Sequence, residues 1–270
     1  MSERALYSNT VAPAEAGWLA KPLLLGLSLS TVALVGIILL AAALRFVNID
    51  AIGDGNTYYT AAVTSMLQSW ENFFFVAAEP GGSVTVDKPP LGLWLQAVSA
   101  SVFGVSGFSV ALPQILAGIF SIPLLYHLVK RHFGEGAGLV AALILAITPV
   151  AIAVERNNTM DATLMFTLLL AAWAFLEATE QGKRGWLLLG AVLVGLAFNI
   201  KMLQAFLPVP AFYALYLLGS EEGWGRKVVN LILASLVLLA VSLSWAITVD
   251  LTPADQRPYI GSRSNNSVME

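Results

Sequence analysis

The chain lacks cysteine and has few charged residues. Only 11% of its 270 residues are Asp, Glu, Lys or Arg, whereas soluble domains carry about 25%. Without cysteine, disulfides, zinc–thiolate sites, iron–sulfur clusters and thiol catalysis are excluded. The 14 basic and 17 acidic residues give a net charge of −3, so nucleic-acid binding has no electrostatic support. With 57% hydrophobic residues and a mean hydropathy of +0.76, the composition predicts a polytopic membrane protein and excludes a soluble enzyme.

Long apolar runs predict an all-α bundle of transmembrane helices. A helix needs about 20 apolar residues to cross about 30 Å of hydrocarbon. Seven runs approach this length, and an eighth, 91–103, is shorter. Lys201 divides the apolar stretch 186–218 into two spans, and Pro208 and Pro210 should bend or break the second of them. The seven expected spans are 23–46, 109–129, 137–154, 160–178, 186–200, 203–218 and 228–249.

The distribution of charge between the loops predicts how the bundle is oriented. If 91–103 lies in or on the membrane, the basic loops all fall on the cytoplasmic side, and the acidic first loop, 47–108, falls outside. We expect residues 1–22 to be a cytoplasmic tail, 23–249 to be the module in the cytoplasmic membrane, and 250–270 to be an extracytoplasmic stub of a truncated chain. The basic residues expected inside are Arg4, Lys21, Lys130, Arg131, His132, Lys183, Arg184, Arg226 and Lys227.

The first cluster of polar residues follows the first span and contains Asp54, Asn56, Tyr58 and Tyr59. The apolar residues of 60–70 share one side of a helix, which predicts an amphipathic helix on the outer surface. Asp54 could cap this helix and interact with its positive end. Alternatively, its carboxylate could act as a general base towards an acceptor hydroxyl.

The second cluster is Asp87 and Lys88, followed by Pro89 and Pro90, which suit the first turn of a helix over 91–103. One interpretation is a neutral Asp–Lys pair at the membrane interface. The other is a lysine that holds a phosphate at the level of the lipid headgroups.

The third cluster contains Arg156, Asn157, Asn158 and Asp161, between the third and fourth spans. Asn158 could cap the fourth span, with Asp161 three residues later as in a capping box. However, Asp161 falls inside an apolar helix, where a charge is costly. We therefore favour a polar functional site.

Lys201 and Gln204 lie on the same outer side, at the turn between two spans. Lys201 could be a snorkelling lysine or a second cation for phosphate. The residues Arg263, Asn265 and Asn266 are expected in a flexible tail, and the two histidines, His127 and His132, on the inner side. Two carboxylates and two lysines at headgroup depth suit a lipid-phosphate substrate whose chain lies between helices.

These residues give the chain its resemblance to the GT-C membrane glycosyltransferases. The segment 86–94, with the sequence VDKPPLGLW, and the segment 158–161, with the sequence NTMD, resemble the protein O-mannosyltransferases and the bacterial lipid A aminoarabinose transferases. The resemblance implies that a sugar is transferred from a polyprenyl-phosphate donor to a lipid, protein or cell-wall polymer outside the membrane. It also implies that Lys88 and Lys201 hold the donor phosphate and that Asp161 supports the acceptor.

The chain departs from this family in the first loop. Gly55 and Asn56 stand where the family usually has an Asp-Glu pair. Either Asp54 serves as the base through a slipped register, or another residue does. A divalent ion is compatible with Asp54 and Asp161, but a full carboxylate cage would require Asp87 to converge with them.

Three functions are therefore compared. The first is an inverting glycosyltransferase in which lysines stabilise the departing phosphate. The second is a catalytically inactive lipid-binding or scaffold protein, which the missing Asp-Glu pair favours. The third is a transporter, which would need polar residues near the middle of the membrane, where the spans have few.

Overall fold

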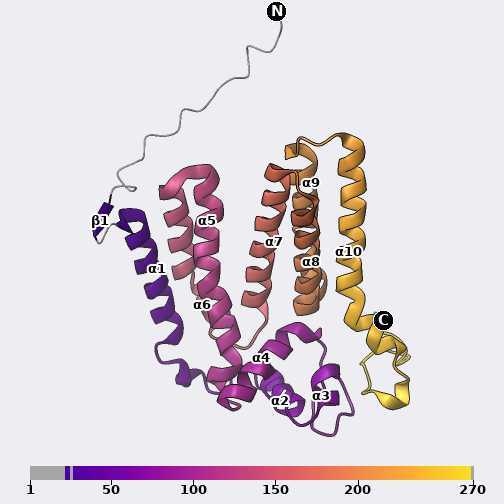
Figure 1. The fold of residues 1–270 in the computed structure, drawn as a ribbon. Coiled ribbons are helices and arrows are strands. Elements are labelled where there is room, and N and C mark those ends of the chain that lie inside the picture. Colours follow the sequence, from indigo (N-terminus) through magenta and orange to yellow (C-terminus); the bar gives the residue numbers. More distant parts are fainter. Residues whose placement is uncertain (1–21, 25–26, 269–270) are drawn as a thin grey trace, which may run out of the picture.

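The structure is a computed structural model that describes residues 22–24 and 27–268. It is a helical bundle, preceded by a short antiparallel pair of strands, β1 (Pro22–Leu24) and β2 (Leu27–Ser28). Five helices are long and apolar enough to cross a membrane (Figure 1), which confirms the expected multi-pass helical fold. They are α1 (Leu29–Phe46), α5 (Gly107–Ile147), α7 (Asp161–Gln181), α8 (Arg184–Lys201) and α10 (Trp224–Leu251).

Helix α5 consists of two helical halves joined at Gly134, whose φ of 85° and ψ of 170° are not helical. The ribbon reverses direction there (Figure 1), and Ile122 of the first half packs in one cluster with Ala142 and Ala146 of the second. The two halves correspond to the expected spans 109–129 and 137–154. The second half ends earlier than expected because Pro149 begins a separate short helix, α6 (Pro149–Glu155).

Other helix boundaries also differ from the sequence-based ones. The expected first span begins at Leu29 rather than at 23, because Ser28 caps α1. The run 203–218 is divided at Pro208 into the 3₁₀ helix η4 (Met202–Phe206) and α9 (Val209–Gly219), as its prolines predicted. Because α9 has only 11 residues, the count of seven spans stays a prediction.

Short helices gather at one end of the bundle (Figure 1). The single surface helix expected over 60–70 is instead two helices, which break between Met66 and Trp70. The elements of the first loop are η3 (Ile49–Ile52), α2 (Thr57–Met66), α3 (Trp70–Phe75) and α4 (Pro90–Phe103).

Helix α8 packs against both α7 and α10 through small residues. A Cβ at Gly190 would lie 2.8 Å from the Phe175 ring of α7, and one at Gly195 would lie 2.7 Å from Val241 of α10. Small residues allow helices to approach closely where lipid provides no hydrophobic driving force. This packing aligns the end of α8 with the beginning of α7, where the polar site is built.

A buried ion pair joins α1 to α6. Arg45 pairs with Glu155, and the side chains are 0% and 1% exposed. The guanidinium also donates to the carbonyls of Ala41 and Ala146 at 3.1 Å, and Gly118 leaves room for the Glu155 carboxylate. Although Arg45 stands near the end of α1, its charge is not exposed, because a carboxylate inside the bundle compensates it.

The segment after α10 is folded rather than a flexible tail. It contains the 3₁₀ helix η5 (Ala254–Gln256). Tyr259 donates its N–H to the carbonyl of Ser83 at 2.8 Å and accepts from the N–H of Thr85 at 2.9 Å. Asp250 accepts from the Val268 N–H at 2.7 Å. The Tyr259 bonds hold the segment against the first loop, and the Asp250 bond holds it against the end of α10.

Candidate functional site

The centre of the candidate site is an ion pair between Asp161 and Lys201. Asp161 is the first residue of α7 and Lys201 the last of α8. Their side chains are 38% and 24% exposed, so both remain open to a ligand. Both residues were candidates from the sequence, but their direct pairing was not anticipated.

Lys88 lies in a second ion pair, 2.6 Å from the carboxylate of Asp87. Burial lowers the pKa of Lys88, but the hydrogen bond to Asp87 and the charges of Tyr59 and Asp87 raise it more, so the pKa lies above its usual value. The pKa of Tyr59 is also raised, chiefly by burial. The Tyr58 hydroxyl accepts from the Asp87 N–H at 3.4 Å.

The two ion pairs are connected through the packing of α4. A Cβ at Gly92 would lie 2.5 Å from Met160 and 3.6 Å from Ile200, the residues that precede Asp161 and Lys201. Lys88, Asp87 and Met202, the residue after Lys201, line a common cavity of about 210 Å³. The structure therefore brings the Lys-Pro-Pro segment to the ends of α7 and α8.

Three asparagines dock the first loop onto the turn before α7. The Asn56 N–H donates to the side-chain oxygens of Asn157 at 3.1 Å and Asn158 at 2.7 Å. The Asn158 amide donates to the Asn56 carbonyl at 3.2 Å and to the Thr60 hydroxyl at 3.0 Å. The buried Asn158 also has its own carbonyl bound by Gln96 at 2.8 Å. These asparagines therefore have a structural role beside the site.

Both helix caps suggested by the sequence are wrong. Asn56, not Asp54, caps α2, by accepting from the N–H groups of Tyr58 and Tyr59. Asn158 does not cap α7, whose N-cap is Met160 without a side-chain hydrogen bond. The Asn158 side chain is unavailable for capping because it is bonded to the first loop.

Asp54 is held through its backbone. Its carbonyl accepts from the Thr60 hydroxyl at 2.7 Å, and neighbouring Gly55 lies against the Asn158 side chain. The residue is exposed, and its carboxylate has no hydrogen bond or ion pair with the described part of the chain. Asp54 is therefore free to act on a ligand, close to the segment that leads to Asp161.

The guanidinium group of Arg156 makes its hydrogen bonds away from the two ion pairs. It donates to the carbonyls of Leu44 and Val47, both at 2.9 Å, and of Asn48 at 3.1 Å. These carbonyls lie at and beyond the C-terminal end of α1, where a cation is favoured. The expectation that Arg156 belongs to a site with Asp161 is not met, because it caps a different helix.

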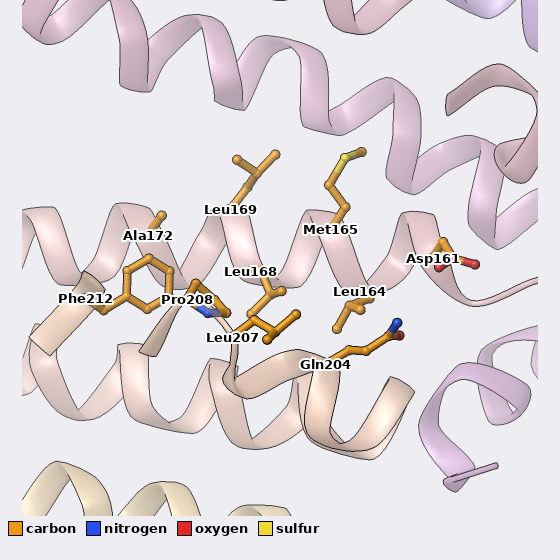
Figure 2. A pocket seen from close by; sticks show the side chains of 10 residues that line it. All are labelled: Asp161, Leu164, Met165, Leu168, Leu169, Ala172, Gln204, Leu207, Pro208 and Phe212. Atoms are coloured by element: carbon orange, nitrogen blue, oxygen red, sulfur yellow. The ribbon is translucent and has the colours of Figure 1, made fainter. Parts of the chain in front are cut away.

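An apolar cavity opens beside Asp161 (Figure 2). It has a volume of about 640 Å³ and lies between α7 and the η4–α9 region. Asp161 and Gln204 stand at one end, and Ala172 and Phe212 at the other (Figure 2). The remaining lining residues are Leu164, Met165, Leu168, Leu169, Leu207 and Pro208. This arrangement, polar at one end and apolar along its length, can hold an amphiphile with an anionic head.

The carboxylates do not form a metal cage. No group of three His, Cys, Asp or Glu residues that could hold a metal occurs among the described residues. Asp161 and Asp87 instead have lysines as counter-ions.

Two tryptophans that the sequence did not single out connect the first loop to the helices of the bundle. The indole N–H of Trp94 donates to the Phe73 carbonyl at 2.7 Å, and that of Trp245 donates to the Phe74 carbonyl at 2.9 Å. They tie the end of α3 to α4 and α10. The sequence does place Trp94 in the apolar run 91–103 and Trp245 in the run 228–249. It does not indicate which carbonyl either indole contacts.

Comparison with known proteins identifies relatives with transferase names. YycA of Bacillus subtilis (strain 168), a candidate mannosyltransferase, is 50% identical over 88% of this chain and 35% of its own. The undecaprenyl phosphate-alpha-4-amino-4-deoxy-L-arabinose arabinosyl transferase of Pseudomonas paraeruginosa (strain DSM 24068 / PA7) is 31% identical over 63% of this chain and 32% of its own. The chain thus spans about a third of the length of these relatives.

A solved structure shares the fold. The oligosaccharyltransferase of Archaeoglobus fulgidus in its apo form matches 82% of this chain and 29% of its own, with a TM-score of 0.62 and 18% identity. The family model for dolichyl-phosphate-mannose-protein mannosyltransferase matches residues 87–245, from Asp87 to Trp245. The match includes Lys88, Lys201 and Asp161, in agreement with the resemblance noted in the sequence. The chain therefore belongs to the dolichyl-phosphate-mannose-protein mannosyltransferase family, within the GT-C glycosyltransferases.

Proposed function

We propose that the protein transfers a sugar from a polyprenyl-phosphate donor to an acceptor hydroxyl, with inversion at the anomeric carbon. The observation that carries the proposal is the apolar cavity with the Asp161–Lys201 ion pair at its polar end. A polyprenyl chain needs an apolar groove, and its phosphate needs a cation at the mouth. The lipid-binding alternative explains the groove, but leaves the exposed carboxylates without a role.

Lys201 holds the donor phosphate in this proposal. In the structure, Asp161 is the counter-ion of Lys201. An incoming phosphate would compete for the ammonium group and release the Asp161 carboxylate. Lys88, whose pKa is raised, supplies a second positive charge from the segment just before α4. Two cations stabilise the phosphate as it departs.

The chemistry is a single displacement. The acceptor oxygen forms a bond to the anomeric carbon as the bond from that carbon to the phosphate oxygen breaks. The polyprenyl phosphate leaves with the electron pair, and a carboxylate takes the hydroxyl proton. Asp54 is the proposed base because its carboxylate has no partner in the described structure, and Asp161, once released from Lys201, supports the acceptor.

We further propose seven crossings, with the site on the outer side of the cytoplasmic membrane. The two halves of α5 would cross separately, and η4 with α9 would provide the sixth span. The turn of α5 carries Lys130 and Arg131, and the α7–α8 and α9–α10 links lie at this same end, opposite to the site (Figure 1). Basic residues favour the cytoplasmic side.

The test is sugar transfer from a labelled polyprenyl-phosphate sugar in membranes, with Asp54→Asn as the first variant. Removal of a general base typically costs 10²–10⁴-fold in rate, so we expect at least a hundredfold loss. Asn56→Ala is a useful comparison, because it removes the α2 cap without removing a carboxylate. If Asp54→Asn retains full turnover, the base lies elsewhere and Asp161 is the next residue to replace.

A further inference from the structure

A second polar cavity lies at the end of the bundle opposite to Asp161. It has a volume of about 510 Å³ and is lined by residues of the α7–α8 link, of the α9–α10 link and of the beginning of α10. Its lining includes Arg184, Arg226, Glu222 and Asn230. None of these residues takes part in the proposed transfer reaction.

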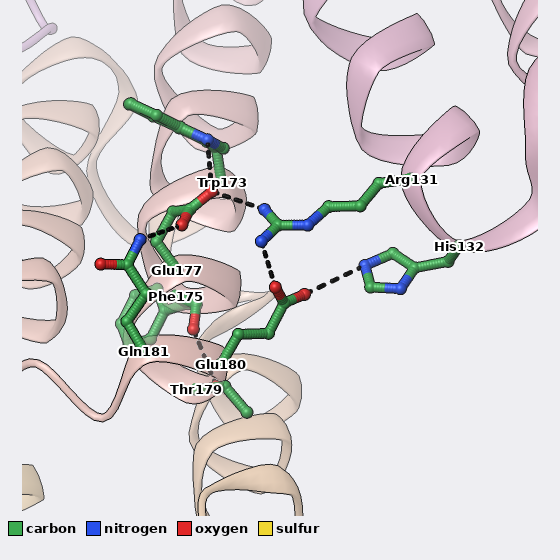
Figure 3. Close-up of polar contacts among 8 residues, drawn as sticks. All are labelled: Arg131, His132, Trp173, Phe175, Glu177, Thr179, Glu180 and Gln181. Carbon is green, nitrogen blue, oxygen red and sulfur yellow. Dashed lines mark hydrogen bonds and ion pairs between the residues drawn. The ribbon is translucent and has the colours of Figure 1, made fainter. Parts of the chain in front are cut away.

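Most basic side chains at this end already have partners. Arg131 contacts Glu177 and Glu180, as Figure 3 shows, and Lys130 lies 2.8 Å from Glu135. Lys227 donates to the Leu217 carbonyl at 2.8 Å. In the network of Figure 3, Arg131 is therefore already paired with two carboxylates and offers no unpaired positive charge to an anionic ligand.

Arg184 and Arg226 differ from these residues. The guanidinium group of neither residue makes a hydrogen bond or an ion pair with any residue that the structure describes, yet both residues line the same cavity. The guanidinium group, with its fork of donors, is well suited to phosphate oxygens. The cavity also contains the first turn of α10, which begins at Trp224 without a side-chain cap and adds a weaker attraction for an anion.

The arginines favour an anionic group in the cavity, whereas Glu222 favours a hydrogen-bond donor. One carboxylate oxygen, Oε2, receives hydrogen bonds from the Tyr216 hydroxyl at 2.5 Å and from the Asn230 amide at 2.9 Å. The other oxygen, Oε1, has no donor among the described residues. An occupant should therefore combine an anionic group for the arginines with a hydrogen-bond donor for Glu222.

The surroundings of the cavity are apolar and exposed. Trp224 is 66% exposed and Val229, which lines the cavity, is 55% exposed. Tryptophan is enriched at the level of lipid headgroups, and the exposed face of α10 continues from there with Val228 and Ile232. Acyl chains could lie along this face while a headgroup occupies the cavity.

We propose that this cavity binds the headgroup of a membrane phospholipid that carries a phosphodiester and a hydrogen-bond donor. Arg184 and Arg226 bind the phosphodiester, and Glu222 accepts from the ammonium or hydroxyl group beyond it. Phosphatidylethanolamine and phosphatidylglycerol meet both requirements, whereas phosphatidylcholine has no such donor. The site is independent of the proposed transfer reaction and lies at the other end of the bundle.

The test is native mass spectrometry of the purified protein in detergent, titrated separately with the three phospholipids at matched acyl chains. We expect phosphatidylglycerol and phosphatidylethanolamine to bind more tightly than phosphatidylcholine. Hydrogen bonds between charged groups are roughly twice as strong as those between neutral groups, so Arg184→Ala and Arg226→Ala should each weaken binding roughly tenfold or more. Glu222→Gln should reduce the preference over phosphatidylcholine.

Lys183→Ala is the matched control, because it removes the same charge at the neighbouring position without altering the cavity lining. Equal losses of lipid affinity in Lys183→Ala and Arg184→Ala would overturn the proposal, because binding would then depend on the overall positive charge of this end and not on the cavity. Glycerol phosphate is added as a soluble competitor. If it binds as tightly as phosphatidylglycerol, and only when both arginines are present, the phosphate chemistry holds but the lipid source is wrong. Unchanged thermal melting of each variant shows that the fold is intact.

Discussion

Asp161 and Lys201 form an ion pair between the first residue of α7 and the last residue of α8. The pair lies at the polar end of the apolar cavity, so an anionic headgroup that enters the cavity meets Lys201 in contact with its counter-ion. Each partner is therefore expected to affect a different step. Lys201 should determine donor affinity, and Asp161 should affect turnover after the phosphate has displaced it.

Replacement of Lys201 tests whether this residue determines donor affinity. We expect Lys201→Ala to raise KM for the donor and abolish most transfer, whereas Lys201→Arg should retain part of the donor affinity because it keeps the charge. The measurement is initial rate against donor concentration in membranes. Lys183→Ala, at the opposite end of the bundle, is the control for general charge loss. Normal donor KM in Lys201→Ala would exclude this lysine from the phosphate site.

The cavity should set the preference for donor chain length. Ala172 lies at the end remote from Asp161 (Figure 2), so Ala172→Trp should block the distal part of the groove. For a long-chain donor, KM should rise roughly tenfold or more, because each excluded CH₂ loses about 0.8 kcal/mol of burial. A donor with a short chain should be little affected. The same change at Leu189, an exposed residue outside the cavity lining, should affect neither donor. Equal effects on both donors in Ala172→Trp would contradict this assignment.

The charge of Lys88 should make donor binding independent of pH near neutrality. Its pKa is raised above the ordinary lysine value, so the cation persists through this range and its contribution is lost only as pH rises through the folded-state pKa. The donor is a phosphodiester and does not titrate there either. In Lys88→His, the cation should disappear as pH rises through roughly 6.5, and donor affinity should fall with it. Donor titrations at pH 5.5 and 8 measure this. A pH-independent affinity in Lys88→His would remove residue 88 from the phosphate site.

Much of the fold and several site residues could be predicted from the sequence. Apolar runs of sufficient length identify membrane helices because the requirement for about 20 residues is physical. The charged positions Asp161, Lys88 and Lys201 stand out because charge is costly at the edge of an apolar helix. What the sequence could not indicate is pairing across long separations, such as Asn56 with Asn158 or Arg45 with Glu155. These partners depend on which helices lie side by side.

The helix N-caps are a second feature that the sequence alone does not assign. Asp54, Asn56 and Asn158 are all suitable N-cap residues, and local sequence does not distinguish among them. The folded loop leaves Asn56 in position to cap α2 and uses Asn158 to bind that loop. The short separation of Arg156 and Asp161 in the sequence predicts that they share a site, yet the Arg156 guanidinium is bonded to carbonyls at the end of α1.

The buried pair Arg45–Glu155 should be important for stability. Removal of one partner of a buried ion pair typically costs 3–5 kcal/mol, because the other charge is left uncompensated. We expect Glu155→Ala to lower the thermal midpoint in detergent strongly, and the double variant Arg45→Met/Glu155→Leu to recover most of the loss. Glu135→Ala, at a partly exposed pair, should have a small effect. A Glu155→Ala variant as stable as the wild type would show that the pair is not needed for the fold.

The central claim is tested most directly by transfer of a radiolabelled sugar from a polyprenyl-phosphate donor, measured in membranes for the wild type and for Asp161→Asn at saturating donor. We predict measurable transfer by the wild type and a loss of at least tenfold in kcat for Asp161→Asn, with donor binding retained because Lys201 is still present. Full turnover in Asp161→Asn, or a wild type that binds the donor without transferring its sugar, would contradict the proposed role of this ion pair in glycosyl transfer.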